Sequence, residues 1–224
     1  ALWRDGYVET YLERDLRLQA QVADVPDFLR LMRIAAARTG AILNVSGLAR
    51  EAGLSVSTCR RWLNVLAVCF QARAVPAFTA SRTRRLVKAP RLHWMDSGMA
   101  CHLAGLRSPA ALEASPLYGA MVETFAVQNV AALGAASREQ PGILYWRTAS
   151  GIEVDLVLET SSGVLPVEIK AGRKVTDRDA AGLRAFMSEH PKAARTGAVL
   201  YGGTEVVPLG GACLAVPMSL LFAG

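Results

Sequence analysis

The 224-residue sequence lacks several patterns that define common protein classes. No stretch matches G-x-x-x-x-G-K-[S/T], so we expect no ATP binding through a P-loop within this chain. No apolar run reaches the roughly 18 residues needed to span a bilayer, and the first residues do not have the basic-then-apolar order of a signal peptide. The sequence therefore predicts a cytoplasmic protein that does not interact with membranes.

Cysteine is sparse and follows no functional spacing. The four cysteines are Cys59, Cys69, Cys101 and Cys213. They form neither a C-x-x-C pair nor a zinc-finger pattern, so we expect reduced and mostly buried thiols.

Acidic residues are missing from a long stretch of the first half of the chain. Between Glu51 and Asp96 there is no Asp or Glu, whereas eight Lys or Arg residues fall there. Residues 1–110 carry 16 basic against 8 acidic residues, and residues 111–224 carry 9 against 11. A basic first half and a slightly acidic second half are the balance expected of a DNA-holding module joined to a metal-dependent one.

The acid-free stretch lies within a predicted winged helix-turn-helix domain, residues 44–106. Asn44 or Ser46 is placed to cap a first helix that ends at Ala52, and Gly53–Ser55 provides a tight turn. A second helix is predicted from residue 57. Two strands, over residues 67–75 and 86–94, would follow and enclose a basic wing.

Side chains at the start of the second helix and in the wing are positioned for bases and phosphates. The candidate nucleic-acid contacts are Ser57, Thr58, Arg60, Arg61, Arg82, Arg84, Arg85 and Lys88. The alternative interpretation is that the winged helix is a docking joint for protein and that the basic loop is only a solvated surface.

The parts of the chain before and after this domain differ in character. Residues 1–43 are predicted to be helical, either as a linker from an upstream domain or as a packing helix pair. Asp96 is predicted to cap a helix over Ser97–Leu103. The Gly105–Ser115 segment marks a boundary, so residues 107–224 form the last predicted domain.

Two runs of alternating apolar and polar residues predict a β-hairpin in this last domain. They cover Gly151–Glu159 and Val164–Lys170, and a short polar connection separates them. Asp155 lies on the first strand, and Glu168 and Lys170 share one face of the second. A carboxylate among Val, Ile and Leu is costly unless it is paired or binds a metal ion.

One acidic residue also interrupts the apolar helix predicted over residues 117–134. Glu123 is the only charged residue between Glu113 and Arg138. The functional interpretation makes it a third site carboxylate beside the hairpin. The structural alternative is a Glu that binds Arg147 or a backbone amide.

Further elements complete a mixed sheet flanked by helices, which makes the fold class α/β with α+β elements. Strands are predicted at Ile143–Arg147 and Gly197–Tyr201, with a final edge strand at Cys213–Pro217. A helix capped by Thr176 or Asp177 lies between them, so the order allows a parallel crossover.

These residues resemble a known fold. Asp155 followed by Glu168-Ile169-Lys170 resembles the PD-(D/E)xK restriction-endonuclease-like fold, whose third acid lies on the preceding helix. The wider chain resembles the C-terminal region of bacterial and archaeal AAA+-type ATPases, domain-of-unknown-function family 4143. The matching segments are Tyr11–Asp15, Ala36–Gly40, Arg85–Pro90 and the hairpin.

The resemblance implies a metal-dependent phosphodiester hydrolase that acts on DNA. Glu123, Asp155 and Glu168 would bind one or two Mg²⁺ or Mn²⁺ ions, with the Ile169 carbonyl as an additional ligand. Lys170 would orient the attacking water or stabilise the transition state.

The same resemblance implies that flanking cations hold neighbouring phosphates and that other partners lie outside this chain. Arg147 and Lys174 are the candidate phosphate contacts. ATP would enter only through an upstream ATPase domain of the full-length protein. The alternative is a catalytically inactive module that binds DNA or protein and regulates the ATPase, in which Lys170 forms a purely structural ion pair with Glu168 or Asp155.

Overall fold

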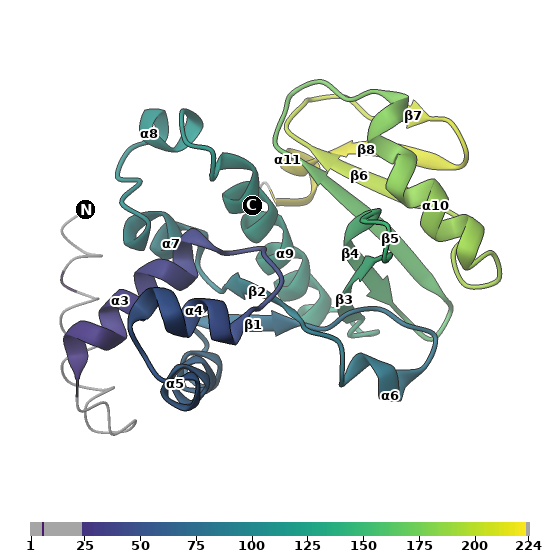
Figure 1. Cartoon of the computed structure of the whole chain (residues 1–224). Helices are drawn as coiled ribbons and strands as arrows, with labels where there is room; N and C mark the ends of the chain where they lie inside the picture. Colours follow the sequence, from purple (N-terminus) through teal and green to yellow (C-terminus); the bar gives the residue numbers. More distant parts are fainter. Residues whose placement is uncertain (1–5, 7–23, 223–224) are drawn as a thin grey trace. The chain divides into compact units, whose positions relative to one another are not determined.

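The structure of the protein is a computed structural model that describes residue 6 and residues 24–222. It divides the chain into two compact units (Figure 1), each described by itself. Unit 1 comprises residues 1–74 and 92–124, and unit 2 comprises residues 75–91 and 125–224. The predicted helix around Tyr7–Leu18 lies outside the described residues.

Unit 1 is mostly helical. Its elements are α3 (Val25–Ala37), α4 (Val45–Ala52), α5 (Val56–Val68), most of β1 (Ala72–Val75) and β2 (Arg91–Trp94), α7 (Ser97–Leu103) and α8 (Pro109–Glu113). The helices begin where the sequence offers an oxygen to a free backbone N–H group. The carboxylate of Asp96 accepts from Met99 N at 2.7 Å, which confirms the predicted start of α7.

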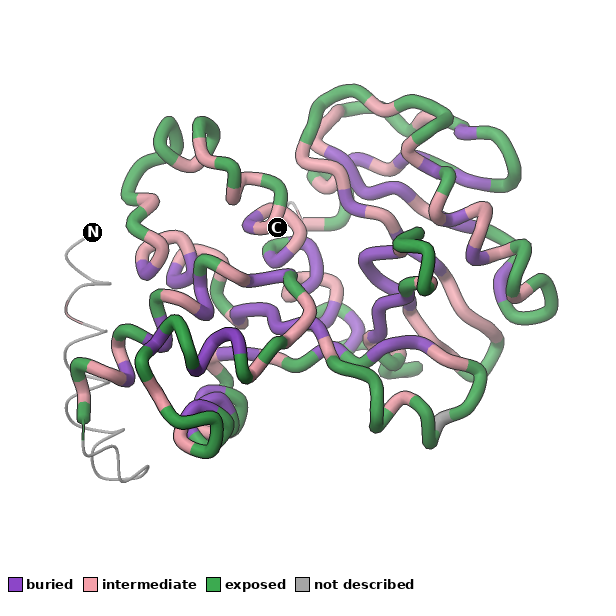
Figure 2. The backbone as a smooth tube through the Cα atoms, viewed as in Figure 1, coloured by how far each residue is buried: buried purple, intermediate pink, exposed green. Residues whose placement is uncertain are grey.

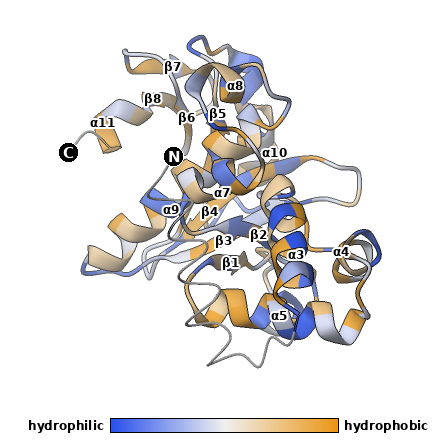
Figure 3. Cartoon of the chain, turned by 90° about the vertical axis from the view of Figure 1, so that its left-hand side faces the viewer, coloured by the Kyte–Doolittle hydropathy of each residue, from blue (hydrophilic) through white to orange (hydrophobic). Residues whose placement is uncertain are grey.

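The pair α4 and α5 forms around a tight turn. Asn44 caps α4, and Gly53 ends it in the left-handed region, at φ 66°, which glycine adopts without steric cost. Ser55 then caps α5. The buried side of α5 carries Cys59 and Trp62, and the Trp62 ring meets Phe28 edge-on at 5.4 Å. Figure 3 shows hydrophilic and hydrophobic residues on both α3 and α5, as expected of amphipathic helices.

The predicted strands of the wing are wrong in their bounds. Residues 67 and 68 belong to α5, because the helical spacing of its buried residues continues to Leu66. The strands themselves are only β1 and β2, of four residues each. Between them the expected wing tip contains one helical turn, α6 (Arg82–Arg85).

The long apolar helix is confirmed as α9 (Tyr118–Ala136). Its residues up to Thr124 belong to unit 1, and those from Phe125 belong to unit 2. Glu123 is therefore a residue of unit 1, at the point where the chain enters unit 2.

Unit 2 is built on a six-stranded sheet of order β3-β4-β5-β6-β8-β7. The strands are β3 (Gly142–Arg147), β4 (Glu153–Glu159), β5 (Val164–Lys170), β6 (Gly197–Tyr201), β7 (Val207–Leu209) and β8 (Cys213–Pro217). The 3-10 turn η2 (Asp177–Ala180) and α10 (Ala181–Glu189) connect β5 to β6, which pair in parallel as predicted.

The outer strand of this sheet was not predicted. Cys213–Pro217 was expected at the edge, but β8 lies between β6 and β7. The short strand β7 pairs antiparallel with it and takes the edge position. After β8 the chain forms α11 (Met218–Phe222).

The predicted hairpin is confirmed, with Leu156 opposite Val167 and Leu158 opposite Leu165. Because side chains alternate along a strand, these four share one face of the sheet, and Asp155, Glu168 and Lys170 share the other. Phe186 of α10 packs in the core on this second face. Buried residues run through the middle of the sheet (Figure 2).

The segment between β1 and β2 belongs to unit 2 because it pairs with β3. Ala77 forms a bridge with Tyr145, and Phe78 N donates to Tyr145 O at 2.5 Å. Phe78 is buried in the core of unit 2. The described chain is thus a mixed α/β structure with a helical N-terminal part. None of its described helices is long and apolar enough to cross a membrane.

Candidate metal site and nucleic-acid surfaces

The hairpin brings three of the predicted site residues together. Leu156 on β4 is paired with Val167 on β5. Asp155 directly precedes Leu156 and Glu168 directly follows Val167, so in the antiparallel pair the two acids occupy neighbouring positions. Lys170 lies two residues beyond Glu168 on the same face. The structure therefore places two carboxylates and an ammonium group on the α10 side of the sheet.

Asp155 is held on both of its oxygens. Oδ2 accepts a hydrogen bond from Ile169 N at 3.0 Å, and Oδ1 lies 3.3 Å from Arg91 Nη1. The residue is 9 % exposed, so its charge is largely withdrawn from water. The backbone N–H and the guanidinium compensate for the lost hydration.

Glu168 differs from Asp155 in that only one of its oxygens has a partner. Oε1 accepts from Lys170 Nζ at 2.8 Å, whereas Oε2 is buried and has no hydrogen-bond partner among the described residues. The pKa of Glu168 is raised to about 7, mainly by burial and also by the charge of Asp155, and Lys170 partly offsets both effects.

Lys170 stays charged in this setting. Burial alone would lower its pKa, but the hydrogen bond to Glu168 and the charges of Glu168 and Asp155 outweigh burial, so the pKa of Lys170 is raised. Its side chain is 36 % exposed, which leaves the ammonium group reachable from solvent.

Helix α10 approaches the cluster at a glycine. A Cβ built on Gly182 would lie 2.4 Å from Glu153 O and 3.8 Å from Glu168 Oε2. No side chain fits at that distance from a backbone oxygen, so glycine permits the close packing of α10 over the two carboxylates.

Arg91 is the site residue that sequence analysis missed. The residue is 4 % exposed, and its guanidinium pairs with Asp155 and donates to Glu153 Oε2 at 2.7 Å. It also lies 5.1 Å from the centre of the Tyr145 ring. The sequence signal that points to it is that a carboxylate among apolar residues, as at Asp155, requires a cation. Arg91 is one of the basic residues of the acid-free stretch that could supply it.

Glu123 belongs to unit 1 and lies near His93 and Gly40 of the same unit. One carboxylate oxygen lies 3.8 Å from His93 Nε2, and the next residue, Thr124, shares a hydrogen bond of 2.7 Å with Thr39. A Cβ on Gly40, which adopts φ 79°, would meet the Glu123 carboxylate at 3.3 Å. The convergence of Glu123 with the hairpin stays a prediction.

The residues present fit a divalent cation in part. A pair of carboxylates that includes one unpartnered buried oxygen is the type of donor set that Mg²⁺ and Mn²⁺ prefer. Against this, no group of three or more His, Cys, Asp or Glu side chains is arranged to hold a metal ion in the part of the chain that the structure describes. The role of Asp155 and Glu168 as metal ligands stays a prediction.

The two flanking cations are at the surface. Arg147 Nε lies 3.9 Å from Glu153 Oε2 and is 46 % exposed. Lys174 is exposed in the segment after β5. Their role as phosphate contacts stays a prediction.

The predicted contacts on α5 lie at its exposed side. Ser57, Arg60 and Arg61 are exposed, and Thr58 is half-buried. The Ser57 and Thr58 hydroxyls lie within hydrogen-bond distance of Ser55 Oγ, so they belong to the helix cap. The two arginines have no acidic partner within the described residues, and this leaves their charges open to an anion.

The predicted wing residues are less uniform. Arg84 and Lys88 are exposed, and the side chain of Arg82 is outside the described part. Arg85 instead forms a two-pronged ion pair with Glu159, at 2.6 and 2.8 Å, and lies over the Phe78 ring. The hydrogen bond to Glu159 raises the pKa of Arg85. Arg85 thus has a structural partner in unit 2.

Comparison with known families confirms part of the predicted resemblance. Residues 118–221 match the model of the domain of unknown function DUF4143. Residues 1–110 match a second domain of unknown function, DUF8612. The two matches cover most of the chain, and neither description states an activity.

Two relatives of about the same similarity come from mycobacteria. An uncharacterised protein of Mycobacterium tuberculosis and one of Mycobacterium bovis are each 31% identical over 217 residues, which is 97% of this chain. The aligned part is 47% of each relative, so the chain spans about half the length of the curated relatives it matches. No solved structure matches the chain significantly.

Proposed function

We propose that unit 2 is a PD-(D/E)xK-like, divalent-metal-dependent nuclease module that acts on DNA. The observation that carries the proposal is the buried, unpartnered oxygen of Glu168 beside Asp155, with Lys170 on the other oxygen. A structural ion pair alone would leave no reason to bury a carboxylate oxygen without a partner, since this costs about 1–3 kcal/mol.

In this proposal Asp155 and Glu168 hold Mg²⁺ or Mn²⁺, with Glu123 as the predicted third acid. The bound cation would lower the pKa of a water molecule and offset charge on the phosphodiester. Lys170 has N–H groups left after its bond to Glu168, and these orient the water or a phosphate oxygen. Arg147 and Lys174 would hold flanking phosphates.

We further propose that α4 and α5 act as a helix-turn-helix that holds DNA for the nuclease module. The exposed arginines Arg60 and Arg61 near the start of α5 support this proposal. Arg84 and Lys88 are additional exposed cations in the segment after β1. The AAA+-type resemblance adds the proposal that an ATPase domain of the full-length protein is the partner that binds ATP.

A second candidate function is a catalytically inactive module that binds DNA or protein. The observation that favours it is Arg91, whose guanidinium already pairs with both Asp155 and Glu153. In this second candidate function Asp155 and Glu153 serve only as ion-pair partners of Arg91, so the cluster stabilises unit 2 and catalyses no reaction.

The test uses supercoiled and linear DNA with Mg²⁺ or Mn²⁺ and compares the chain with Asp155→Asn, Glu168→Gln and Lys170→Met. We expect cleavage that requires the cation and falls by at least about 100-fold in each variant, because each loses a ligand or a transition-state contact. Glu205→Gln is the matched control, since Glu205 is exposed and far along the chain from the hairpin. Cleavage that survives the three substitutions would exclude this site.

If no cleavage occurs, a calorimetric measurement of Mn²⁺ binding separates the two candidate functions. Affinity that is lost in Asp155→Asn and Glu168→Gln supports the metal site. Absence of Mn²⁺ binding, together with salt-dependent retention of DNA, supports the inactive binding module.

A further inference from the structure

An apolar groove lies on the face of the sheet opposite the carboxylate cluster. It has a volume of about 440 Å³ and is lined by α9, α11 and the strands β4, β5, β6 and β8. Val167 and Leu200 form part of its floor, and Leu133 and Leu221 lie on its rim. Ser137 is the one polar side chain of its lining, and its hydroxyl already donates to Gly134 O.

A second pocket of about 550 Å³ continues this groove at the turn of the hairpin. The two cavities share Pro141, Leu158 and Leu165 as lining residues, so they adjoin on unit 2 and together are called the depression. The character of the lining changes along it from aliphatic to polar. Its polar end carries Arg195 and Lys192.

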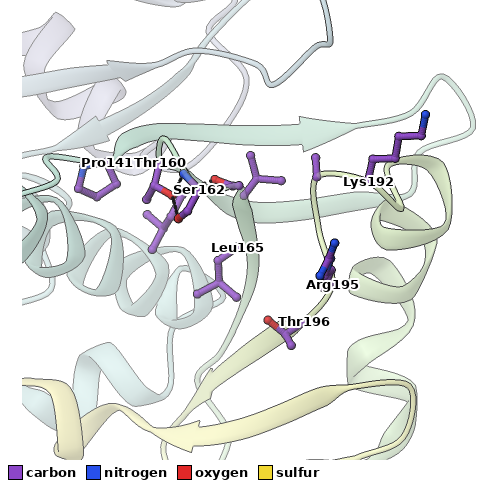
Figure 4. Close-up of a pocket in the computed structure, with 11 residues that line it drawn as sticks. Pro141, Thr160, Ser162, Leu165, Lys192, Arg195 and Thr196 are labelled. Carbon is purple, nitrogen blue, oxygen red and sulfur yellow. Dashed lines mark hydrogen bonds between the residues drawn. The ribbon is translucent and has the colours of Figure 1, made fainter.

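The polar end is suited to an anion. Its lining contains Lys192, Arg195 and the hydroxyls of Thr160, Ser162 and Thr196, but no Asp or Glu. Neither cation has an acidic partner in the described part of the chain. Figure 4 shows Arg195 and Thr196 on the opposite side of the pocket from Pro141 and Thr160, with Lys192 at the outer end. Arg195 is therefore the main candidate for an anion.

We propose that this depression binds an aliphatic anion, with its chain in the groove and its carboxylate or phosphate head group at Arg195. Volumes of about 300–1,000 Å³, a mostly apolar lining and a few polar groups at one end are typical of small-molecule sites. The charge of the polar end and the lack of polar groups in the groove favour this ligand over a nucleotide. The proposal is independent of the nuclease site on the other face.

The experiment is calorimetric titration of the 224-residue chain with octanoate, decanoate and dodecanoate below their micelle concentrations. We expect the affinity to increase roughly two- to fourfold per added methylene until the groove is filled, as for burial of an aliphatic chain. Dodecyl phosphate should bind comparably. Dodecyltrimethylammonium, of the same chain length and opposite charge, should bind at least about tenfold more weakly.

Three variants and a matched control locate the site. Arg195→Gln should weaken dodecanoate by about fivefold, a moderate effect because the guanidinium is exposed. Ala198→Phe should abolish binding by filling the groove, and Leu133→Ser, at a rim position that is 51 % exposed, should weaken binding without disturbing the core. The control Arg178→Gln removes the same charge from η2 and should change nothing.

The outcomes separate the sources of the ligand and the ways in which the proposal fails. Co-sedimentation with phosphatidylglycerol vesicles would show that the chain takes its ligand from a bilayer, and binding of monomers alone would show a free amphiphile. Both outcomes support the site. The proposal is overturned if dodecanoate does not bind, or if its affinity is unchanged in Arg195→Gln and Leu133→Ser. Either result favours a protein segment as the occupant of the groove.

Discussion

The basic residues of the acid-free stretch are used in two different ways in the two units. Arg60 and Arg61, on α5 of unit 1, are exposed and have no acidic partner among the described residues. Arg85 and Arg91, in unit 2, bind carboxylates that follow 74 and 62 residues later in the chain. One uniform charge pattern in the sequence therefore yields a solvent-facing cationic surface and a set of internal ion pairs.

The difference teaches that charge density along a chain does not by itself identify an anion-binding surface. A guanidinium can be buried only where a carboxylate compensates for its lost hydration. The acidic second half supplies Asp155 and Glu159 for this purpose. The segment that carries Arg85 and Arg91 consequently belongs with the sheet, whereas α5 keeps its charges in water.

The largest effect is expected from Arg91→Met. The substitution leaves Asp155, which is 9 % exposed, without its cation, and breaking a buried pair costs about 3–5 kcal/mol. Chemical denaturation of the variant should show a loss in this range. The matched control is Arg60→Met, at an exposed position of α5, which should change the free energy of unfolding by less than about 0.5 kcal/mol.

If Arg91→Met and Arg60→Met changed the free energy of unfolding equally, the contrast between the two units would be wrong. A double variant, Arg91→Met with Asp155→Leu, should recover much of the loss, because the buried charge is then removed together with its partner. A double variant that is no more stable than Arg91→Met would show that Arg91 acts through its packing on Tyr145 instead.

The next effect concerns pH and compares Glu168 with an ordinary carboxylate. Its pKa of about 7 exceeds the value of roughly 4.3 expected in the unfolded chain. The folded state therefore holds the proton more tightly, so this contribution to stability is fully present below about pH 4 and is lost as the pH rises to about 7. Glu168→Gln should remove that decline, roughly 3–4 kcal/mol from the difference between the two pKa values, measured by denaturation at several pH values.

The control for the pH effect is Glu205→Gln, at an exposed site, which should leave the pH profile as it is. Addition of Mn²⁺ provides an independent measure. If the cation binds at Glu168 it favours the charged carboxylate, so the affinity for Mn²⁺ should increase as the pH rises towards 7. A profile that is the same in Glu168→Gln and in the unsubstituted chain would contradict the assignment.

The smallest effect on stability is expected from Arg60→Gln with Arg61→Gln. Because both side chains are exposed, the free energy of unfolding should change by less than about 0.5 kcal/mol. If α5 contacts DNA phosphates, the slope of log K against log salt should fall by about two, measured by filter retention of a duplex. An unchanged slope would assign the exposed arginines to solvent only.

Much of unit 2 was predictable because its signals are local. The alternation in residues 151–159 and 164–170 identified the hairpin and the shared face of Glu168 and Lys170, since each depends only on the period of a strand. The caps at Asp96 and Asn44 were predictable for the same reason. The convergence of Glu123 with this hairpin does not depend on local sequence signals, and it stays a prediction.

The errors arose where neighbours in space are distant in sequence. Residues 67 and 68 have strand-like composition, but the packing of Leu66 and Trp62 extends α5 through them. The three residues of β7 carry too little pattern to be detected, so β8 was assigned to the edge in their place. Arg91 was counted as one basic residue among eight.

The sequence alone determined the hairpin, its turn, the two faces of its strands and the basic character of α5, because period and composition act over a few residues. The tertiary structure decided which cation neutralises Asp155, which oxygen of Glu168 is left without a partner, and which strand lies at the edge of the sheet. These depend on contacts between segments far apart in the chain, and burial makes such contacts decisive by removing the water that would otherwise take their place.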